Sequence, residues 1–222
     1  MSTYKVLLID DHPMIIAGFE QALEIIKEND EKIKFYKDSA LDCTNAATYI
    51  SNPNKTYDLI CLDLSLPGSE DRKYNSGEDL ANLARKHQPK AKLLICTMLE
   101  NNYKILNVMK RLDPEGFLVK SDTNPDILIS AIENLLQGNT YQSSTVHQML
   151  KRTIDFAHNI DEEDLKILYL LSQGTLTKNL PKHMSLSLSA IEKRKKQMKL
   201  FFDIPNTNDK VLLEKAKEKG FL

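Results

Sequence analysis

Short apolar runs alternate with amphipathic stretches along the first part of the chain. The runs at residues 6–9, 33–36, 59–62, 93–96 and 117–119 are rich in apolar and β-branched residues, which is typical of buried strands. Between the first two runs, apolar residues recur at helical spacing, as at Ile15, Ile16, Phe19, Leu23 and Ile26. Because strands alternate with helices, the pattern predicts an α/β fold with a parallel, doubly wound sheet.

The pattern changes to purely helical from Asp161 onward. Asp161 is expected to cap a helix that ends at Gly174, and later stretches predict a second, third and fourth helix. In the third, residues 188–202, an apolar stripe is formed by Leu188, Ile191, Met198 and Phe202. We therefore expect one domain at residues 1–140, a linker at 141–158 with a helical piece over 146–156, and an all-α domain at 159–222.

Composition limits the class of protein. The 222 residues are 41% hydrophobic and 27% charged, which is ordinary for a globular chain of one or two domains. No apolar run could span a bilayer, and acids interrupt the N-terminal stretch too early for a signal peptide. The three cysteines lack metal-ligand spacing, so we expect buried, reduced thiols in a cytoplasmic protein without a membrane partner.

The charge is distributed unevenly along the chain. Residues 1–142 contain 16 basic and 21 acidic side chains, whereas residues 143–222 contain 14 basic and 10 acidic ones. The two parts are thus expected to have different partners, and the basic part is suited to a polyanion.

Chemically active side chains follow four of the predicted strands. These are Asp10 and Asp11, then Asp63, Thr97 and Lys120. Ligands of open α/β sheets bind at this edge, where carboxylates without a cation would repel each other. The set predicts a Mg²⁺ site at which Asp63 could attack phosphorus, with Lys120 and Thr97 holding the phosphoryl oxygens. Taken singly, each residue is equally explained as an ordinary turn or surface residue, so the hypothesis depends on their convergence.

The stretches "IDDHPMIIAGFEQAL", "DLICLDLSLPG", "LLICTMLENNY" and "GFLVKS" resemble the response-regulator receiver domain, specifically the NarL/FixJ class with a LuxR-type helix-turn-helix. The resemblance implies a flavodoxin-like, five-stranded parallel sheet of order 2-1-3-4-5, followed by a small all-α helix-turn-helix domain. It implies that a sensor histidine kinase phosphorylates Asp63. The implied Mg²⁺ ligands are Asp10, Asp11, Asp63 and the Ser65 backbone carbonyl. Thr97 and Lys120 would contact the phosphoryl group, and Phe117 matches the aromatic switch position, although plain core packing explains it almost as well.

The chain departs from the family pattern at several places, which include Glu192 and Arg194 in the rear domain. Residues 69–76 extend the loop beside Asp63, either as a tolerated insertion or as a segment that shapes kinase choice or phosphoryl lifetime. Residues 112–116 replace the usual small residues, from which we expect a local change only. Pro181 falls early in the second helix of the rear domain and must lie in its first turn or kink it.

A basic helix follows a short turn in the rear domain, as in helix-turn-helix proteins. The residues predicted to contact DNA are Lys193, Arg194, Lys196, Gln197 and Lys199. The lysines and Arg194 would mostly contact phosphates, and Gln197 or Arg194 could read bases. A solvated helix face is the simpler explanation of such a charge run.

The leading hypothesis is a DNA-binding response regulator that controls transcription and forms a homodimer when phosphorylated. The alternative is a receiver-based interaction module whose divergent rear domain does not bind DNA. Asp63-Leu64-Ser65 has no second acid two residues after Asp63, so we expect no enzyme activity beyond slow self-dephosphorylation.

Overall fold

The computed structural model describes residues 1–69, 72–98, 101–155 and 159–222. Backbone contacts divide the chain into two compact units, which are described separately. The first contains Met1–Leu99 and Val108–Val146, and the second contains Glu100–Asn107 and His147–Leu222. The described residues form no helix that is long and apolar enough to cross a membrane.

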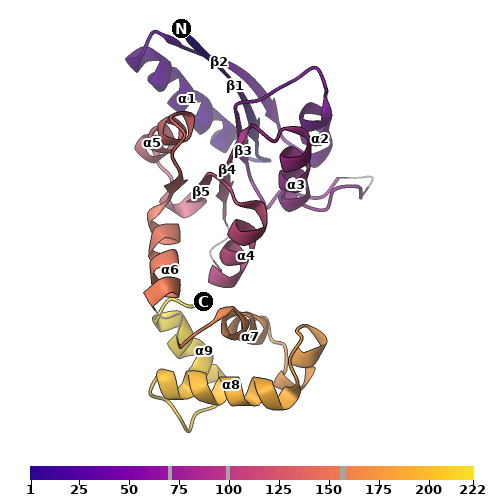
Figure 1. Ribbon diagram of the computed structural model, residues 1–222, viewed down its shortest axis with the longest axis vertical. Helices are drawn as coiled ribbons and strands as arrows, with labels where there is room; N and C mark the ends of the chain where they lie inside the picture. The colour runs from indigo at the N-terminus through magenta and orange to yellow at the C-terminus, as the bar shows by residue number, and fades with distance from the viewer. Residues whose placement is uncertain (70–71, 99–100, 156–158) are drawn as a thin grey trace. The chain divides into compact units, whose positions relative to one another are not determined.

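A parallel sheet forms the centre of the first unit (Figure 1). Its strands are β1 Ser2–Ile9, β2 Ile33–Ala40, β3 Leu59–Leu62, β4 Lys92–Thr97, β5 Gly116–Val119 and β6 Tyr141–Gln142. The order is β2-β1-β3-β4-β5-β6, with every neighbouring pair parallel. The predicted order of the first five strands is confirmed, but the prediction of only five strands is wrong. A two-residue strand is too short to produce an alternating pattern, so β6 had no signal in the sequence.

Helices cover both faces of this sheet, with α1 and α5 on one side and α2 and α3 on the other (Figure 1). The bounds are α1 Pro13–Asn29, α2 Cys43–Ser51, α3 Gly77–His87, α4 Asn102–Leu112, η1 Lys120–Asp122 (a 3-10 helix) and α5 Pro125–Leu136. Alternate strand residues such as Val6, Leu8 and Leu118 pack against the apolar stripes of α1 and α5. Every residue of β3 is buried, because both of its faces are covered, and this explains its continuous apolar run.

The segment predicted to be a linker is partly built into the first unit. Strand β6 pairs with β5, and helix α6 follows at Ser144–Asp155. The helix therefore begins two residues earlier than predicted, and its predicted end at Phe156 lies outside the described residues.

The second unit contains α7 Glu162–Ser172, η2 Thr177–Lys182, α8 Leu188–Phe201 and α9 Asp209–Glu218. Asp161 caps α7 as predicted, in a capping box with Asp164. The second predicted helix is instead the short 3-10 helix η2, and the expectation that Pro181 would start or kink an α-helix is wrong. Proline lacks an N–H and its ring collides with the carbonyl four residues back, so the tighter 3-10 turn replaces the α-helix here.

Candidate functional site

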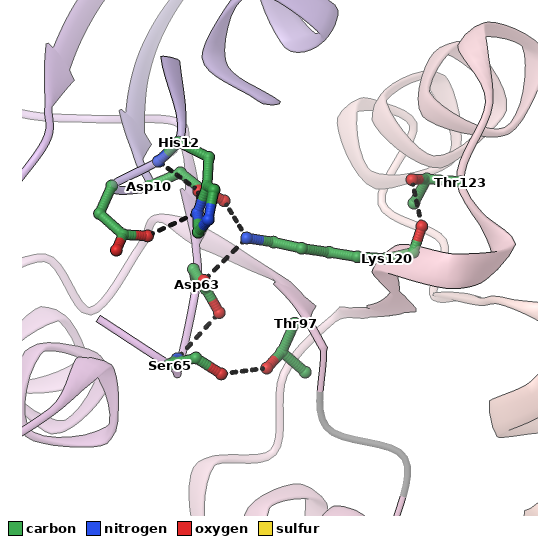
Figure 2. Close-up of polar contacts among 8 residues, drawn as sticks. Asp10, His12, Asp63, Ser65, Thr97, Lys120 and Thr123 are labelled. Atoms are coloured by element: carbon green, nitrogen blue, oxygen red, sulfur yellow. Dashed lines mark hydrogen bonds and ion pairs between the residues drawn. The ribbon is translucent and has the colours of Figure 1, made fainter. Parts of the chain in front are cut away.

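The fold brings three predicted site residues into direct contact at the carboxyl ends of the strands. Asp10 follows β1, Asp63 follows β3 and Lys120 follows β5, and Lys120 lies between the two acids (Figure 2). Its Nζ atom is 2.7 Å from Oδ2 of Asp10 and 2.8 Å from Oδ2 of Asp63. Only 6%, 3% and 1% of the side chains of Lys120, Asp10 and Asp63 is exposed, so the pairing takes place almost without water. Burial by itself would lower the pKa of Lys120, but the hydrogen bonds to the two acids outweigh it and raise that pKa.

Asp11 and His12 complete the cluster. Oxygens of Asp10, Asp11 and Asp63 and a ring nitrogen of His12 all lie within 4.8 Å of one another. The Oδ1 atom of Asp11 is buried and accepts no hydrogen bond within the described chain, although Nδ1 of His12 is 2.7 Å away. A buried carboxylate oxygen without a hydrogen bond, among other hard oxygen donors, suits a divalent cation of the Mg²⁺ type. The residues therefore fit the ion that the sequence predicts. His12 is the N-cap residue of α1, in agreement with its interpretation from the sequence as a turn or capping residue, and it also contacts Asp10.

Ser65 and Thr97 lie next to Asp63, and their hydroxyl groups point toward each other (Figure 2). The backbone N–H of Ser65 donates to Oδ1 of Asp63 at 2.8 Å, and the Ser65 hydroxyl is 3.3 Å from the Thr97 hydroxyl. Thr97 is fully buried at the end of β4, the fourth strand end predicted to contribute. The expected roles of the Ser65 carbonyl and of the Thr97 hydroxyl stay predictions.

The backbone on both sides of Asp63 is held tightly. Its N–H donates to the Ile9 carbonyl at 2.9 Å, and the N–H of Gly77 donates to the Leu64 carbonyl at 3.2 Å. A Cβ atom at Gly77 would lie 2.0 Å from the Asp63 carbonyl oxygen and 2.7 Å from the Leu64 Cα. Only glycine lets α3 begin this close to the strand end, so Gly77 is a site residue that the sequence pattern did not single out.

Two described residues of the extended loop at 69–76, Ser69 and Tyr74, are hydrogen-bonded to each other. The Ser69 N–H donates to the Tyr74 carbonyl at 2.7 Å, and the Tyr74 N–H donates to the Ser69 hydroxyl at 3.0 Å. Residues 70–71 lie outside the described part of the chain. The proposed effect of this loop on kinase choice or phosphoryl lifetime stays a prediction.

Two further groups near the strand ends are fully enclosed. Phe117 in β5 has no exposed surface, which is compatible with both core packing and an inward position of the predicted aromatic switch. Burial raises the pKa of the Cys96 thiol to about 12, so it stays protonated near neutral pH. Cys43, Cys61 and Cys96 are all free and buried, which confirms their predicted burial, and their reduced state stays a prediction.

Helix α8 presents only part of the predicted DNA-contacting set to solvent. Lys193, Lys196 and Gln197 are exposed. Arg194 instead forms ion pairs with Asp161 at 2.8 Å and Asp164 at 3.0 Å, both at the start of α7. Lys199 donates to the Thr207 carbonyl at 2.8 Å and lies 3.3 Å from Asp209.

A basic residue that the sequence interpretation passed over is the most enclosed cation of α8. The side chain of Lys195 is 6% exposed, and its Nζ is 2.8 Å from both the Thr177 hydroxyl and the Asp209 carboxylate. Its burial could have been predicted from the sequence, because residue 195 falls on the same helical stripe as Ile191 and Met198. Asp209 therefore fixes two lysines of α8 inside the domain.

Comparison with known proteins gives consistent results. Residues 6–133 match the family described as the response regulator receiver domain. The chain is 26% identical over 210 residues to the transcriptional regulatory protein RcsB of Escherichia coli K12, covering 93% of this chain and 91% of RcsB. It is 26% identical over 197 residues to the nitrate/nitrite response regulator protein NarP of the same strain, covering 85% and 84% of the two chains. A solved structure of two RcsB dimers bound to two parallel DNAs aligns with a TM-score of 0.62 and 25% identity, covering 97% of this chain and 98% of that chain.

Proposed function

The chain belongs to the proteins with a response regulator receiver domain, and from this premise we propose that it is a transcription regulator controlled by phosphorylation of Asp63. The observation that carries the proposal is the buried Lys120 ammonium between Asp10 and Asp63, beside the Asp11 oxygen that accepts no hydrogen bond within the described chain. The likeness to RcsB and NarP over most of the chain supports the same function. Because such a regulator acts on DNA, we infer that it works in the cytoplasm.

The proposed reaction at Asp63 is a single phosphoryl transfer. An oxygen of the Asp63 carboxylate attacks phosphorus of a phosphohistidine on a sensor kinase. The O–P bond forms as the N–P bond breaks, and the leaving imidazole keeps the electron pair and takes up a proton. Asp10, Asp11 and Asp63, with the Ser65 carbonyl, would hold Mg²⁺, which supplies charge neutralisation at the transferred group when bound.

Lys120 and Thr97 convert the new charge into a structural change. A phosphoryl group adds about −1.5 to −2 charges and three acceptor oxygens, so the ammonium of Lys120 changes partner from the carboxylate to phosphoryl oxygens. The Thr97 hydroxyl, now beside Ser65, turns toward the same group. Movement at the end of β4 alters the space around Phe117, which links the site to the surface of the domain. No external substrate is turned over, and slow self-dephosphorylation ends the signal.

We place DNA binding on helix α8. Lys193 and Lys196 are exposed and positioned to meet phosphates, and exposed Gln197 offers an amide to base edges. Paired half-sites require a two-fold symmetric protein, so we propose a homodimer in the phosphorylated state. RcsB dimers bind DNA in a solved structure to which this chain is similar along nearly its whole length.

One observation favours a second candidate, a receiver that signals by protein contact alone. Arg194 and Lys199, two of the five residues predicted to contact DNA, are held by acids of their own domain. A domain that keeps these cations inside presents a weaker electrostatic footprint to DNA.

Salt-dependent binding of the full chain to promoter fragments separates the two candidates. We expect binding that weakens steeply with salt and tightens after treatment with acetyl phosphate and Mg²⁺. Asp63→Asn should lose the tightening. The matched control is Asp38→Asn, which changes an aspartate of β2 that forms an ion pair with Lys55 and should keep the tightening. Absence of binding with and without acetyl phosphate would favour the interaction module.

A further inference from the structure

An acid next to the phosphorylation site holds the first turn of helix α6. Asp122 is two residues after Lys120, at the end of η1. Its carboxylate accepts the Thr145 backbone N–H at 2.9 Å and the Thr145 hydroxyl at 2.8 Å. Burial alone would raise the pKa of Asp122, but hydrogen bonds from Ser143, Ser144 and Thr145 outweigh it and lower that pKa. Since α6 has no acid in its own first turn, Asp122 supplies the negative charge that its N-terminus favours.

A second connection joins the same two segments from the other side. The N–H of Val119, the residue before Lys120, donates to the Ser143 hydroxyl at 3.3 Å. The Ser143 N–H in turn donates to the Phe117 carbonyl at 3.0 Å. Ser143 is buried, with 2% of its surface exposed. The segments on both sides of Lys120 are thus hydrogen-bonded to the residues at which α6 begins, through the backbone before Lys120 and through the Asp122 side chain after it.

We propose that Asp122 is a positioning residue that transmits the phosphorylation state of Asp63 to helix α6. This inference rests on the proposed function, because it needs a phosphoryl group at Asp63. When Lys120 changes partner, its backbone turn shifts, and Asp122 and Ser143 move the start of α6 with it. Helix α6 runs from the last residues of the first unit into the second, so its first turn is one of the places where the chain passes from one unit to the other.

The geometry favours transmission over simple capping. A cap needs only one acceptor for one N–H, and the preceding residue Ser143 could have provided it locally, but its hydroxyl accepts from Val119. Here the acceptor comes from the turn that carries Lys120, and it binds both the amide and the hydroxyl of Thr145. A two-point contact fixes the direction of the turn as well as its distance, so a rotation of η1 is passed on and not absorbed.

Hydrogen exchange of the full chain tests the proposal without DNA. Exchange of the amides at residues 146–150 is measured before and after phosphorylation by acetyl phosphate with Mg²⁺, and labelling of Asp63 is measured on the same sample. In the native protein we expect labelling to change these exchange rates by about threefold or more. In Asp122→Ala labelling should be unchanged and the exchange response lost. Asp122→Asn keeps one oxygen acceptor for the Thr145 amide and should retain part of the response, and Asp126→Ala, at an exposed acid in the first turn of α5, is the matched control.

Each outcome decides between specific explanations. A labelled Asp122→Ala protein that responds like the native one would overturn the proposal, as would a labelled native protein whose α6 exchange does not change. If Asp122→Ala fails to fold, Thr145→Val removes only the hydroxyl donor and should reduce the response. If the native protein is not labelled at Asp63, the proposed function fails first, and this result is distinct from labelling without a response.

Discussion

The phosphorylation site and the face of helix α8 are both clusters of charge, but they are organised differently. At the phosphorylation site, side chains from three strand ends converge, and a single ammonium bridges two acids that are nearly buried. On α8 the basic residues diverge. Lys193 and Lys196 face solvent, whereas Lys195, Arg194 and Lys199 turn to acids of neighbouring elements. The sheet thus determines which charged side chains meet at the strand ends. On a helix, the neighbouring elements determine which charged side chains stay exposed.

The largest effect is expected from Gly77→Ala, which tests how rigidly the phosphorylation site is held. The new Cβ would lie 2.0 Å from the Asp63 carbonyl oxygen, so α3 or the strand end must move. We expect a loss of about 4 kcal/mol of unfolding free energy or failure to fold. Gly18→Ala in helix α1 is the control, because its Cβ would have an ordinary contact of 3.6 Å with Cδ1 of Leu128. Equal stabilities of the two variants in urea would refute a rigid site.

Lys120→Met should produce the next largest effect. It leaves Asp10 and Asp63 buried without their cation, which should cost about 3 kcal/mol of stability in the presence of a chelator. Mg²⁺ should then raise the melting temperature of the variant more than that of the native protein, because the ion replaces the missing charge. An identical response to Mg²⁺ in both proteins would show that the acids do not bind it.

The exposed lysines of α8 should affect DNA binding more than Lys199, which is held by groups of its own domain. Replacing Lys193 and Lys196 together by alanine should weaken DNA binding by about tenfold, or about 1.4 kcal/mol, and reduce the salt slope by about 2. Lys199→Ala should change affinity little, since its ammonium binds Thr207 and Asp209. Fluorescence anisotropy at several salt concentrations measures both the affinity and the salt slope. Equal losses of affinity in the Lys193/Lys196 and Lys199 variants would contradict the assignment of DNA contacts to the exposed lysines alone.

The smallest effect concerns the acid that holds the enclosed lysines. Burial alone would raise the pKa of Asp209, but Lys195, Lys199 and Thr177 together lower it below its ordinary value of 3.8. Because the folded-state pKa is the lower one, this stabilisation is present above about pH 4 and is lost as the pH falls below 3.8. Asp209→Asn should therefore cost about 1 kcal/mol at pH 7 and progressively less below pH 4. A difference between native and variant stability that does not change with pH would contradict this assignment.

The same contrast explains how far the sequence could be interpreted. Asp10, Asp63, Thr97 and Lys120 were placed together correctly, because parallel strands end at one edge whatever the side chains do. The partners of Arg194 and Lys199 were not foreseen, because Asp161 and Asp209 lie 33 and 10 residues away along the chain and only the packing of α7 and α9 brings them close. Strand β6 and the 3-10 geometry at Pro181 were missed for a different reason, since segments of two to six residues have no period to detect.

The most direct test of the account is labelling of the native protein and of Asp63→Ala by acetyl phosphate with Mg²⁺, measured by intact mass. We expect one phosphoryl group on the native protein, its loss when the ion is chelated before the donor is added, and no labelling of Asp63→Ala. Equal labelling of the two proteins would show that Asp63 is not the acceptor and would overturn the assignment of the whole site.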